Sequence, residues 1–158
     1  MTSALPPFDQ LPDEAIALGA TASDWRGAVR AAGEALHAAG AAEPGYADRM
    51  VAMVEEYGPY IVIAPGLALA HARPGPDVLR PGLALVTLAT PVSFGHAHND
   101  PVCVVIGLAA TEADQHVASV AGLANVFNDP SVIPALAEAA DADEVRRLLG
   151  SASGSDLS

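Results

Sequence analysis

His71 and Arg73 stand together at the end of an apolar run, and this pair has the clearest chemical potential in the chain. The run Ile61-Val-Ile-Ala-Pro-Gly-Leu-Ala-Leu-Ala resembles a strand, and His71-Ala-Arg73 and a Pro-Gly-Pro loop follow it. An unperturbed imidazole has a pKa of about 6.5, so most of it is uncharged and nucleophilic near neutral pH. Arginine keeps its charge and presents a planar fork that suits phosphate or carboxylate. The pair predicts that His71 carries a phosphoryl group.

Two further histidines fall on predicted helices. His116 lies in the first turn of a helix that runs to about Phe127, where free N–H groups favour an anion. It is interpreted either as an exposed helix residue or as an imidazole that donates a hydrogen bond to a phosphoryl oxygen. His37 lies near the carboxyl end of a helix, where a histidine interacts favourably with the helix dipole, and a structural or exposed role is expected.

The segment Phe94-Gly-His96-Ala-His98-Asn-Asp100-Pro allows two interpretations. Two histidines at i and i+2 can bind a metal ion when they share one face, and a carboxylate is a plausible third ligand. A metal-dependent enzyme that uses these three residues is therefore one functional hypothesis. The pattern is short and common, however, so a solvated loop without a metal is the expected alternative.

The composition restricts the functional class. The 158 residues suit one compact domain, and nineteen acids against seven arginines give a net charge of −12. Such a surface repels nucleic acid and anionic membranes and suits a basic partner. No phosphate-cradling glycine motif is present, so a nucleotide cofactor is not expected. The longest apolar run, Val102 to Ala110, is too short to span a membrane. The first twenty residues do not resemble a signal peptide. For these two reasons a cytoplasmic protein is expected. Cys103 is the only cysteine and is interpreted as a core residue.

Hydrophobic periodicity predicts an α/β protein. Helices are expected at 25–39, 46–57, about 114–127, 131–139 and 141–149, and strands at 15–20, 60–63, 67–70, 83–88 and 102–108. This order predicts a single three-layer α/β/α domain with a mixed parallel and antiparallel sheet. The domain spans residues 13–150, after a peripheral segment at 1–12 and before a disordered tail at 151–158.

An ordered set of motifs resembles a known family. They are Tyr57-Gly-Pro-Tyr-Ile-Val-Ile-Ala-Pro-Gly-Leu-Ala-Leu-Ala-His71-Ala-Arg73-Pro, Leu85-Val-Thr-Leu, Phe94-Gly-His, Asn99-Asp-Pro-Val102, and His116 before a helix. Together they resemble the IIA component of the bacterial sugar phosphotransferase system (PTS), of the mannitol/fructose type (EIIA type 2). The ascorbate-like branch is the most similar. The resemblance extends over residues 12 to 150.

The resemblance implies a phosphocarrier. Family members accept a phosphoryl group from the phosphohistidine of HPr and pass it to a IIB component, which phosphorylates sugar brought in by the membrane component IIC. It implies a phosphotransferase in which Nε2 of His71 is phosphorylated and His116 is the second active-site histidine. From the chemistry of its guanidinium, Arg73 is expected to bind the phosphoryl group. His96 and Asp100 are candidates for the active-site rim or a partner contact. No metal or other cofactor is implied.

Two positions depart from the family pattern. Ala70 replaces the usual proline before the active histidine, and Val54-Glu55-Glu56 stands where mannitol-type members carry an arginine. Arg73 is expected to supply the missing charge. Two alternatives to sugar transport remain: a regulatory module whose phosphorylation state at His71 controls a protein partner, and an inactive fold that the change at Ala70 would allow.

Overall fold

The computed structural model describes residues 11–58, 61–96, 99–111 and 131–154. The helix expected to begin near His116 lies outside them, as does His98. The described helices are a 3-10 turn at Asp13–Ala15, α1 (Trp25–Ala38), α2 (Tyr46–Tyr57), α4 (Val132–Ala137) and α5 (Ala142–Gly154). The strands are β1 (Ile16–Ala20), β2 (Val62–Ala64), β3 (Leu67–His71), β4 (Gly82–Val92) and β5 (Val102–Ala109).

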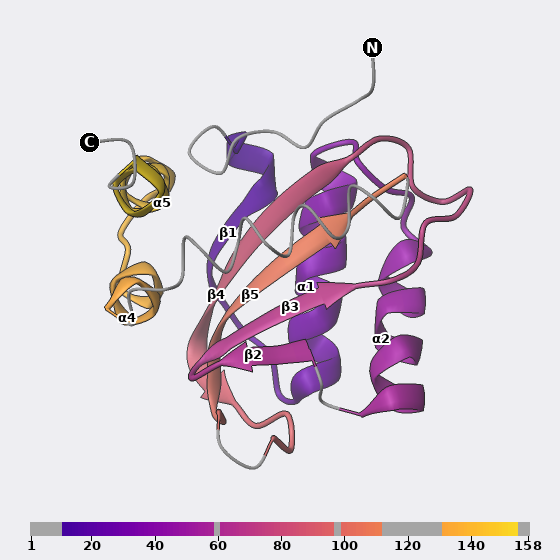
Figure 1. Ribbon diagram of the computed structural model, residues 1–158, viewed down its shortest axis with the longest axis horizontal. Coiled ribbons are helices and arrows are strands. Elements are labelled where there is room, and N and C mark those ends of the chain that lie inside the picture. Colours follow the sequence, from indigo (N-terminus) through magenta and orange to yellow (C-terminus); the bar gives the residue numbers. More distant parts are fainter. Residues whose placement is uncertain (1–10, 59–60, 97–98, 112–130, 155–158) are drawn as a thin grey trace.

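The five strands form one mixed sheet in the order β1-β4-β5-β3-β2 (Figure 1). β1 runs parallel to β4 and β3 runs parallel to β5, whereas the pairs β4–β5 and β2–β3 are antiparallel. The mixed sheet expected from the sequence is confirmed. Because β3 and β5 are parallel and central, their carboxyl ends meet at one end of the sheet.

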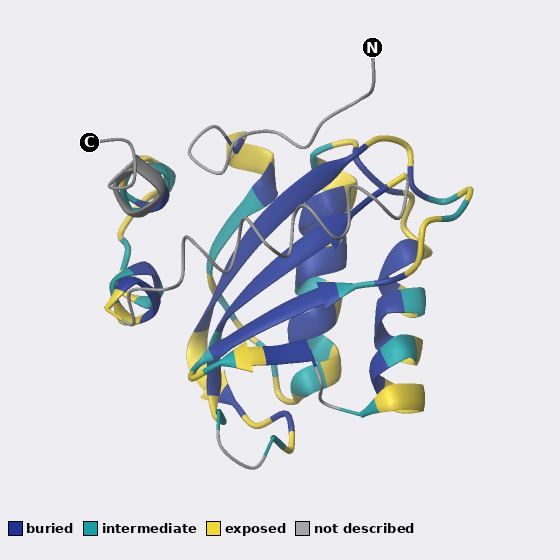
Figure 2. Cartoon of the chain, viewed as in Figure 1, coloured by how far each residue is buried: buried dark blue, intermediate teal, exposed yellow. Residues whose placement is uncertain are grey.

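Helices cover both faces of the sheet, which gives the expected three layers. α1 and α2 lie on one face, and α4 and α5 lie on the other (Figure 1). Side chains alternate between the faces along each strand, and the central strands are buried (Figure 2). Small residues point toward α1 and α2, among them Ala68, Ala70, Ala84 and Val86. Larger residues point toward α4 and α5, among them Leu67, Leu69, Leu85 and Ile106.

The first turn of α2 is held close to the rest of the fold by its contact with α1. A Cβ at Gly33 of α1 would lie only 2.5 Å from the Cβ of Ala47. A side chain at position 33 would therefore push the two helices apart. The carboxylate of Asp24 caps α1 by accepting a hydrogen bond from the Gly27 N–H at 3.0 Å. The packing of α1 against α2 thus fixes the positions of Tyr46 and Arg49, which lie on the first two turns of α2.

The element boundaries differ from the expected ones in a few places. β4 continues past Leu88 to Val92, because Val92 pairs with Val102 beyond an irregularity in the register. α5 extends to Gly154, so the helix enters the segment that the sequence assigns to a disordered tail. Leu11, in the segment expected to be peripheral, is only 3% exposed and packs into the core beside α5.

Within the described ranges no helix is both long and apolar enough to span a membrane.

Candidate functional site

His71 is the last residue of β3 and lies opposite Leu108 of β5. It is half-buried, and its Nδ1 lies 3.2 Å from the carbonyl oxygen of Leu69. A carbonyl oxygen can only accept, so Nδ1 carries the proton in this contact. In the neutral ring, Nε2 then carries the lone pair. The contact with Leu69 thus leaves Nε2 as the unprotonated nitrogen of the neutral ring.

The residue after His71 is held by the hydroxyl of Tyr46, the first residue of α2. The Ala72 N–H donates to this hydroxyl at 3.0 Å, and the hydroxyl lies 2.8 Å from the Leu108 carbonyl oxygen and 3.2 Å from that of Ala72. Tyr46 is fully buried. Desolvation by burial outweighs the hydrogen bond to Ala72 and raises the pKa of Tyr46 to about 12. The hydroxyl therefore keeps its proton at neutral pH, so that it both accepts and donates.

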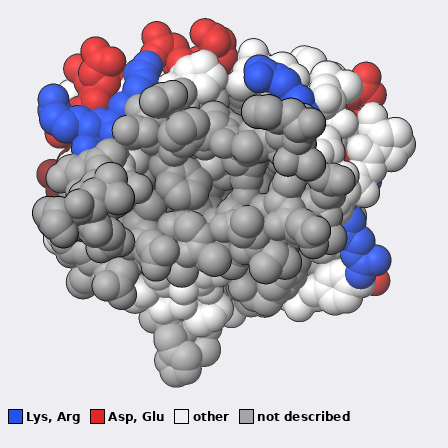
Figure 3. Space-filling view, turned by 45° about the horizontal axis from the view of Figure 1, so that its top comes forward, with Lys and Arg blue, Asp and Glu red and all other residues white. Residues whose placement is uncertain are grey.

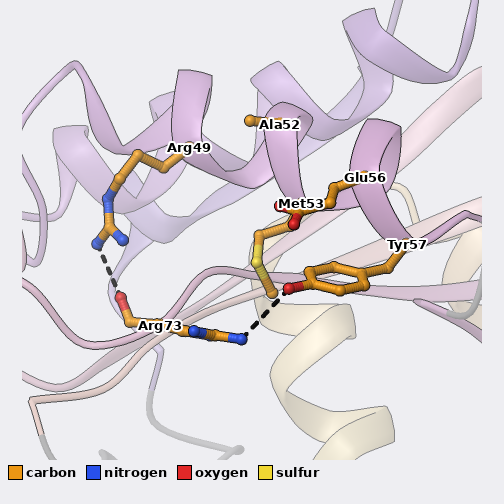
Figure 4. Close-up of a pocket in the computed structure, with 6 residues that line it drawn as sticks. All are labelled: Arg49, Ala52, Met53, Glu56, Tyr57 and Arg73. Carbon is orange, nitrogen blue, oxygen red and sulfur yellow. Dashed lines mark hydrogen bonds between the residues drawn. The ribbon is translucent and has the colours of Figure 1, made fainter.

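One turn further along α2, Arg49 holds the loop that follows β3. Its guanidinium binds both carboxylate oxygens of Asp77, at 2.8 and 2.7 Å, and donates to the Arg73 carbonyl oxygen at 2.7 Å (Figure 4). It also lies over the ring of Tyr46, 5.4 Å from the centroid. The hydrogen bond from Arg49 is the main reason why the pKa of Asp77 is below its ordinary value. Tyr46 and Arg49 thus hold consecutive residues of the segment after His71.

The side chain of Arg73 lies in a surface pocket of about 300 Å³ along α2. Its guanidinium donates to the hydroxyl of Tyr57 at 3.3 Å (Figure 4). The other lining residues follow the three- and four-residue spacing of one helix face, namely Arg49, Ala52, Met53, Glu56 and Tyr57. A cation exposed in a pocket next to the end of β3 is suited to an incoming anion.

Arg73 differs from most other described arginines in what it contacts. Four of them pair with carboxylates: Arg26 with Glu55, Arg30 with Asp48, Arg49 with Asp77, and Arg146 with Asp13 and Asp143. Figure 3 shows arginine and acidic side chains side by side at the margin of one face. Arg73 instead meets the neutral hydroxyl of Tyr57. The sequence interpretation overlooked Arg49, which is an arginine on the helix where mannitol-type members carry one. The guanidinium of Arg49, however, pairs with Asp77.

The loop of His96 and Asp100 lies at the other end of the sheet. It leads into β5 at Val102, whereas His71 pairs with Leu108 near the far end of that strand. The structure therefore does not bring His96 and Asp100 to His71. His98 and His116 lie outside the described residues, so their positions relative to His71 stay a prediction.

Asp100 is occupied by its own loop. Its carboxylate accepts from the N–H groups of Phe94, Gly95 and His96, at 2.9, 2.7 and 2.8 Å, and from the Ser93 hydroxyl at 3.0 Å. Desolvation alone would raise the pKa of Asp100, but these four hydrogen bonds outweigh it and lower that pKa. Nδ1 of His96 accepts from the Asn99 N–H at 3.1 Å. Among the described residues, no three His, Cys, Asp or Glu side chains gather as a metal site requires.

The remaining candidate residues have structural surroundings. Cys103 is half-buried beside the core, and burial raises the pKa of its thiol. His37 lies in the last turn of α1, with Nδ1 3.0 Å from the Ala42 carbonyl oxygen.

The chain and its fold are similar to known proteins. Residues 9–152 match the family model "Phosphoenolpyruvate-dependent sugar phosphotransferase system, EIIA 2". The "Ascorbate-specific PTS system EIIA component" of Salmonella choleraesuis (strain SC-B67) is 39% identical over 138 residues, which are 87% of this chain and 90% of that protein. The crystal structure of IIA mannitol from Escherichia coli matches with a TM-score of 0.79 and 32% identity, over 89% of this chain and 99% of that one. The complex of enzyme IIAMtl and phosphorylated enzyme IIBMtl from Escherichia coli also matches with a TM-score of 0.79, at 31% identity, over 90% of this chain and 98% of that one. The chain therefore belongs to the EIIA 2 family of the phosphoenolpyruvate-dependent sugar phosphotransferase system.

Proposed function

We propose that this protein accepts a phosphoryl group on Nε2 of His71 from phosphorylated HPr and passes it to a IIB component. The observation that carries the proposal is the position of His71 at the end of β3, with its Nδ1–H directed to the Leu69 carbonyl oxygen. In the first step, the Nε2–phosphorus bond forms as the nitrogen–phosphorus bond of the donor phosphohistidine breaks. In the second, Nε2 is the leaving group and a side chain of IIB is the nucleophile. Exchange between such carriers needs no metal or nucleotide.

Two residues assist His71 in this proposal. Phosphoryl transfer depends mainly on positioning and on stabilising charge on the equatorial oxygens. Arg73, exposed two residues after His71, supplies a cation for those oxygens. His116, the second active-site histidine in the family pattern, donates a hydrogen bond to them. These roles rest on the family motifs and on the place of Arg73 next to the end of β3.

The proposed physiological setting is uptake of an ascorbate-like sugar. It is supported by the name of the Salmonella relative, which is 39% identical to this chain over 87% of its length. The protein would act in the cytoplasm between HPr and IIB, with the membrane component IIC reached only through IIB. A net charge of −12 favours encounter with partners that present a basic face.

The test is the intact mass of the protein after incubation with phosphoenolpyruvate, enzyme I and HPr. We expect one acid-labile phosphate on the wild type, none on His71→Ala and slowed labelling of His116→Ala. His96→Ala is the matched control, because it removes a histidine at the opposite end of the sheet, and it should label like the wild type. A wild type that takes no phosphate, or a phosphorylated His71→Ala variant, would disprove the proposal.

The second half of the relay is tested by adding an ascorbate-type IIB component to the labelled protein. Loss of the phosphate from His71 with its appearance on IIB is expected. If the label stays on His71, transport is excluded for that partner, and control of another protein by the phosphorylation state becomes the better interpretation.

A further inference from the structure

The hydroxyl of Tyr46 contacts the residue that follows β3 and the end of β5, next to His71. Paired residues run in register from Leu67 with Val104 to His71 with Leu108. In a continuing parallel ladder, the Ala72 N–H would approach the Leu108 carbonyl oxygen. The Tyr46 hydroxyl contacts both of these groups, 3.0 Å from the nitrogen and 2.8 Å from the oxygen. One buried hydroxyl thus joins the two backbones at the point where the chain leaves the sheet.

Among the described strands, β3 has a partner on one side only at this point. β2 pairs with Leu67 and Ala68 at the start of β3 and does not extend to His71. The backbone after His71 is therefore fixed on the β5 side by Tyr46 and at Arg73 by Arg49. The contacts of Tyr46 join residues 26 and 62 positions away, so they hold the strand end to two separate parts of the fold.

We infer that Tyr46 is a positioning residue for phosphoryl transfer: its hydroxyl fixes the backbone that follows His71 and so sets where the imidazole and Arg73 lie. The inference rests on the proposed function of His71 and adds to it a residue that none of the family motifs contains. Tyr46 does not touch the reacting atoms. It acts through the Ala72 backbone, and Arg49 supports it by binding the Arg73 carbonyl oxygen and Asp77.

The expected effect follows from the precision that the reaction needs. Without the hydroxyl, the Ala72 N–H and the Leu108 carbonyl stay buried and lose a partner, and the segment has to shift to satisfy them. A displacement of about 1 Å at a reacting group can cost on the order of 100-fold in rate. Because Ala70 replaces the proline that normally stiffens this segment, the hydroxyl has a larger share of the positioning here.

The test compares Tyr46→Phe with a control that loses an equivalent hydroxyl elsewhere. Thr87 is 2% exposed, and its Oγ1 accepts from the Gly19 N–H at 2.9 Å on the β1–β4 side of the sheet. Thr87→Val therefore also leaves a buried amide without its partner, but far from His71 along the register. Both variants are expected to lower the melting temperature by similar amounts. Only Tyr46→Phe is expected to reduce kcat for transfer from phosphorylated HPr, by roughly 10- to 100-fold with KM nearly unchanged.

A second measurement does not depend on phosphorylation. Amide hydrogen exchange at Ala72 should be at least about tenfold faster in Tyr46→Phe than in the wild type and unchanged in Thr87→Val. Equal transfer rates for the two variants, or unchanged exchange at Ala72, would overturn the inference. If the wild type itself takes no phosphate, the proposed function fails and positioning for transfer fails with it. Exchange at Ala72 then still decides separately whether the hydroxyl holds this backbone.

Discussion

The two ends of the sheet hold their loops in different ways. At the His71 end, side chains from α2 bind the backbone of a distant segment, with Tyr46 on Ala72 and Arg49 on Arg73. At the opposite end, Asp100 binds groups only four to seven residues before it. Both loops are organised by polar side chains. At the His71 end the stabilising side chains come from α2, outside the loop. At the opposite end the stabilising carboxylate belongs to the loop itself.

This difference decides which polar residues are available for chemistry. The Asp100 carboxylate has four donors and is committed to its own loop. At the His71 end, Tyr46, Arg49 and Asp77 hold the backbone, and the Arg73 side chain lies in the pocket along α2 with its hydrogen bond to the Tyr57 hydroxyl. The histidine and the cation of the proposed relay therefore lie where other residues hold the backbone.

The largest effect that separates the two ends is expected from Arg73→Gln. Removing the cation should slow transfer from phosphorylated HPr about 100-fold, since loss of one donor to developing charge typically has this magnitude. The melting temperature should change little, because Arg73 is exposed and its side chain makes a single hydrogen bond to the described residues, with the Tyr57 hydroxyl. Single-turnover labelling measured by intact mass gives the rate.

Tyr57→Phe is the matched control for that prediction. It removes the hydroxyl that holds the Arg73 guanidinium but leaves the charge, and a change of less than about threefold in rate is expected for an exposed hydrogen bond of this kind. If Arg73→Gln transfers like the wild type, the availability of this cation has no catalytic consequence, and the contrast between the two ends is then only structural.

The reverse pattern is expected from Asp100→Ala. The variant leaves three loop N–H groups and the Ser93 hydroxyl without their acceptor, and we expect a loss of about 2 kcal/mol in the free energy of unfolding. Phosphoryl transfer at His71 should stay within twofold of the wild type when measured well below the unfolding transition. Urea unfolding and labelling kinetics on the same preparation test both halves. A strong loss of transfer in the folded variant would show that the two ends are coupled.

The sequence predicts the elements well where hydrophobic periodicity is strong. α2 has the expected bounds, and β3 and β5 extend past theirs by one residue each. Strand order and register do not follow from periodicity, because they depend on which strands pair across long separations. The sequence therefore did not predict that His71 and the Asp100 loop lie at opposite ends of the sheet. This placement follows directly from the parallel pairing of β3 and β5.

The residues that support the candidate site were harder to predict than the candidate reacting residues. His71 and Arg73 are recognisable because they interrupt an apolar pattern. Tyr46 fits the amphipathic pattern of α2 as an ordinary buried residue, and its partners lie 26 and 62 residues away. In the same way, His96 and Asp100 resemble ligands in sequence, and only the N–H groups around the carboxylate reveal its structural role.

The smallest effect concerns the protonation of Tyr46. Burial raises the pKa of Tyr46 from 10.0 to about 12, so the folded state favours the protonated phenol. Its contribution to stability is complete below pH 10 and is lost as the pH rises toward 12. Between about pH 8 and about pH 10.5, the wild type should lose about 1 kcal/mol more of its unfolding free energy than Tyr46→Phe. Urea unfolding at both pH values measures the difference.

The extra loss of unfolding free energy at alkaline pH tests whether the Tyr46 hydroxyl is buried, as its inferred role requires. Only a phenol desolvated between α2, β3 and β5 has this pH dependence, because an exposed tyrosine has the same pKa folded and unfolded. Equal alkaline losses in the wild type and Tyr46→Phe would mean that water reaches the hydroxyl in solution. The contacts of Tyr46 with Ala72 and Leu108 would then be open to solvent, and the His71 end would be no more firmly held than a solvated loop.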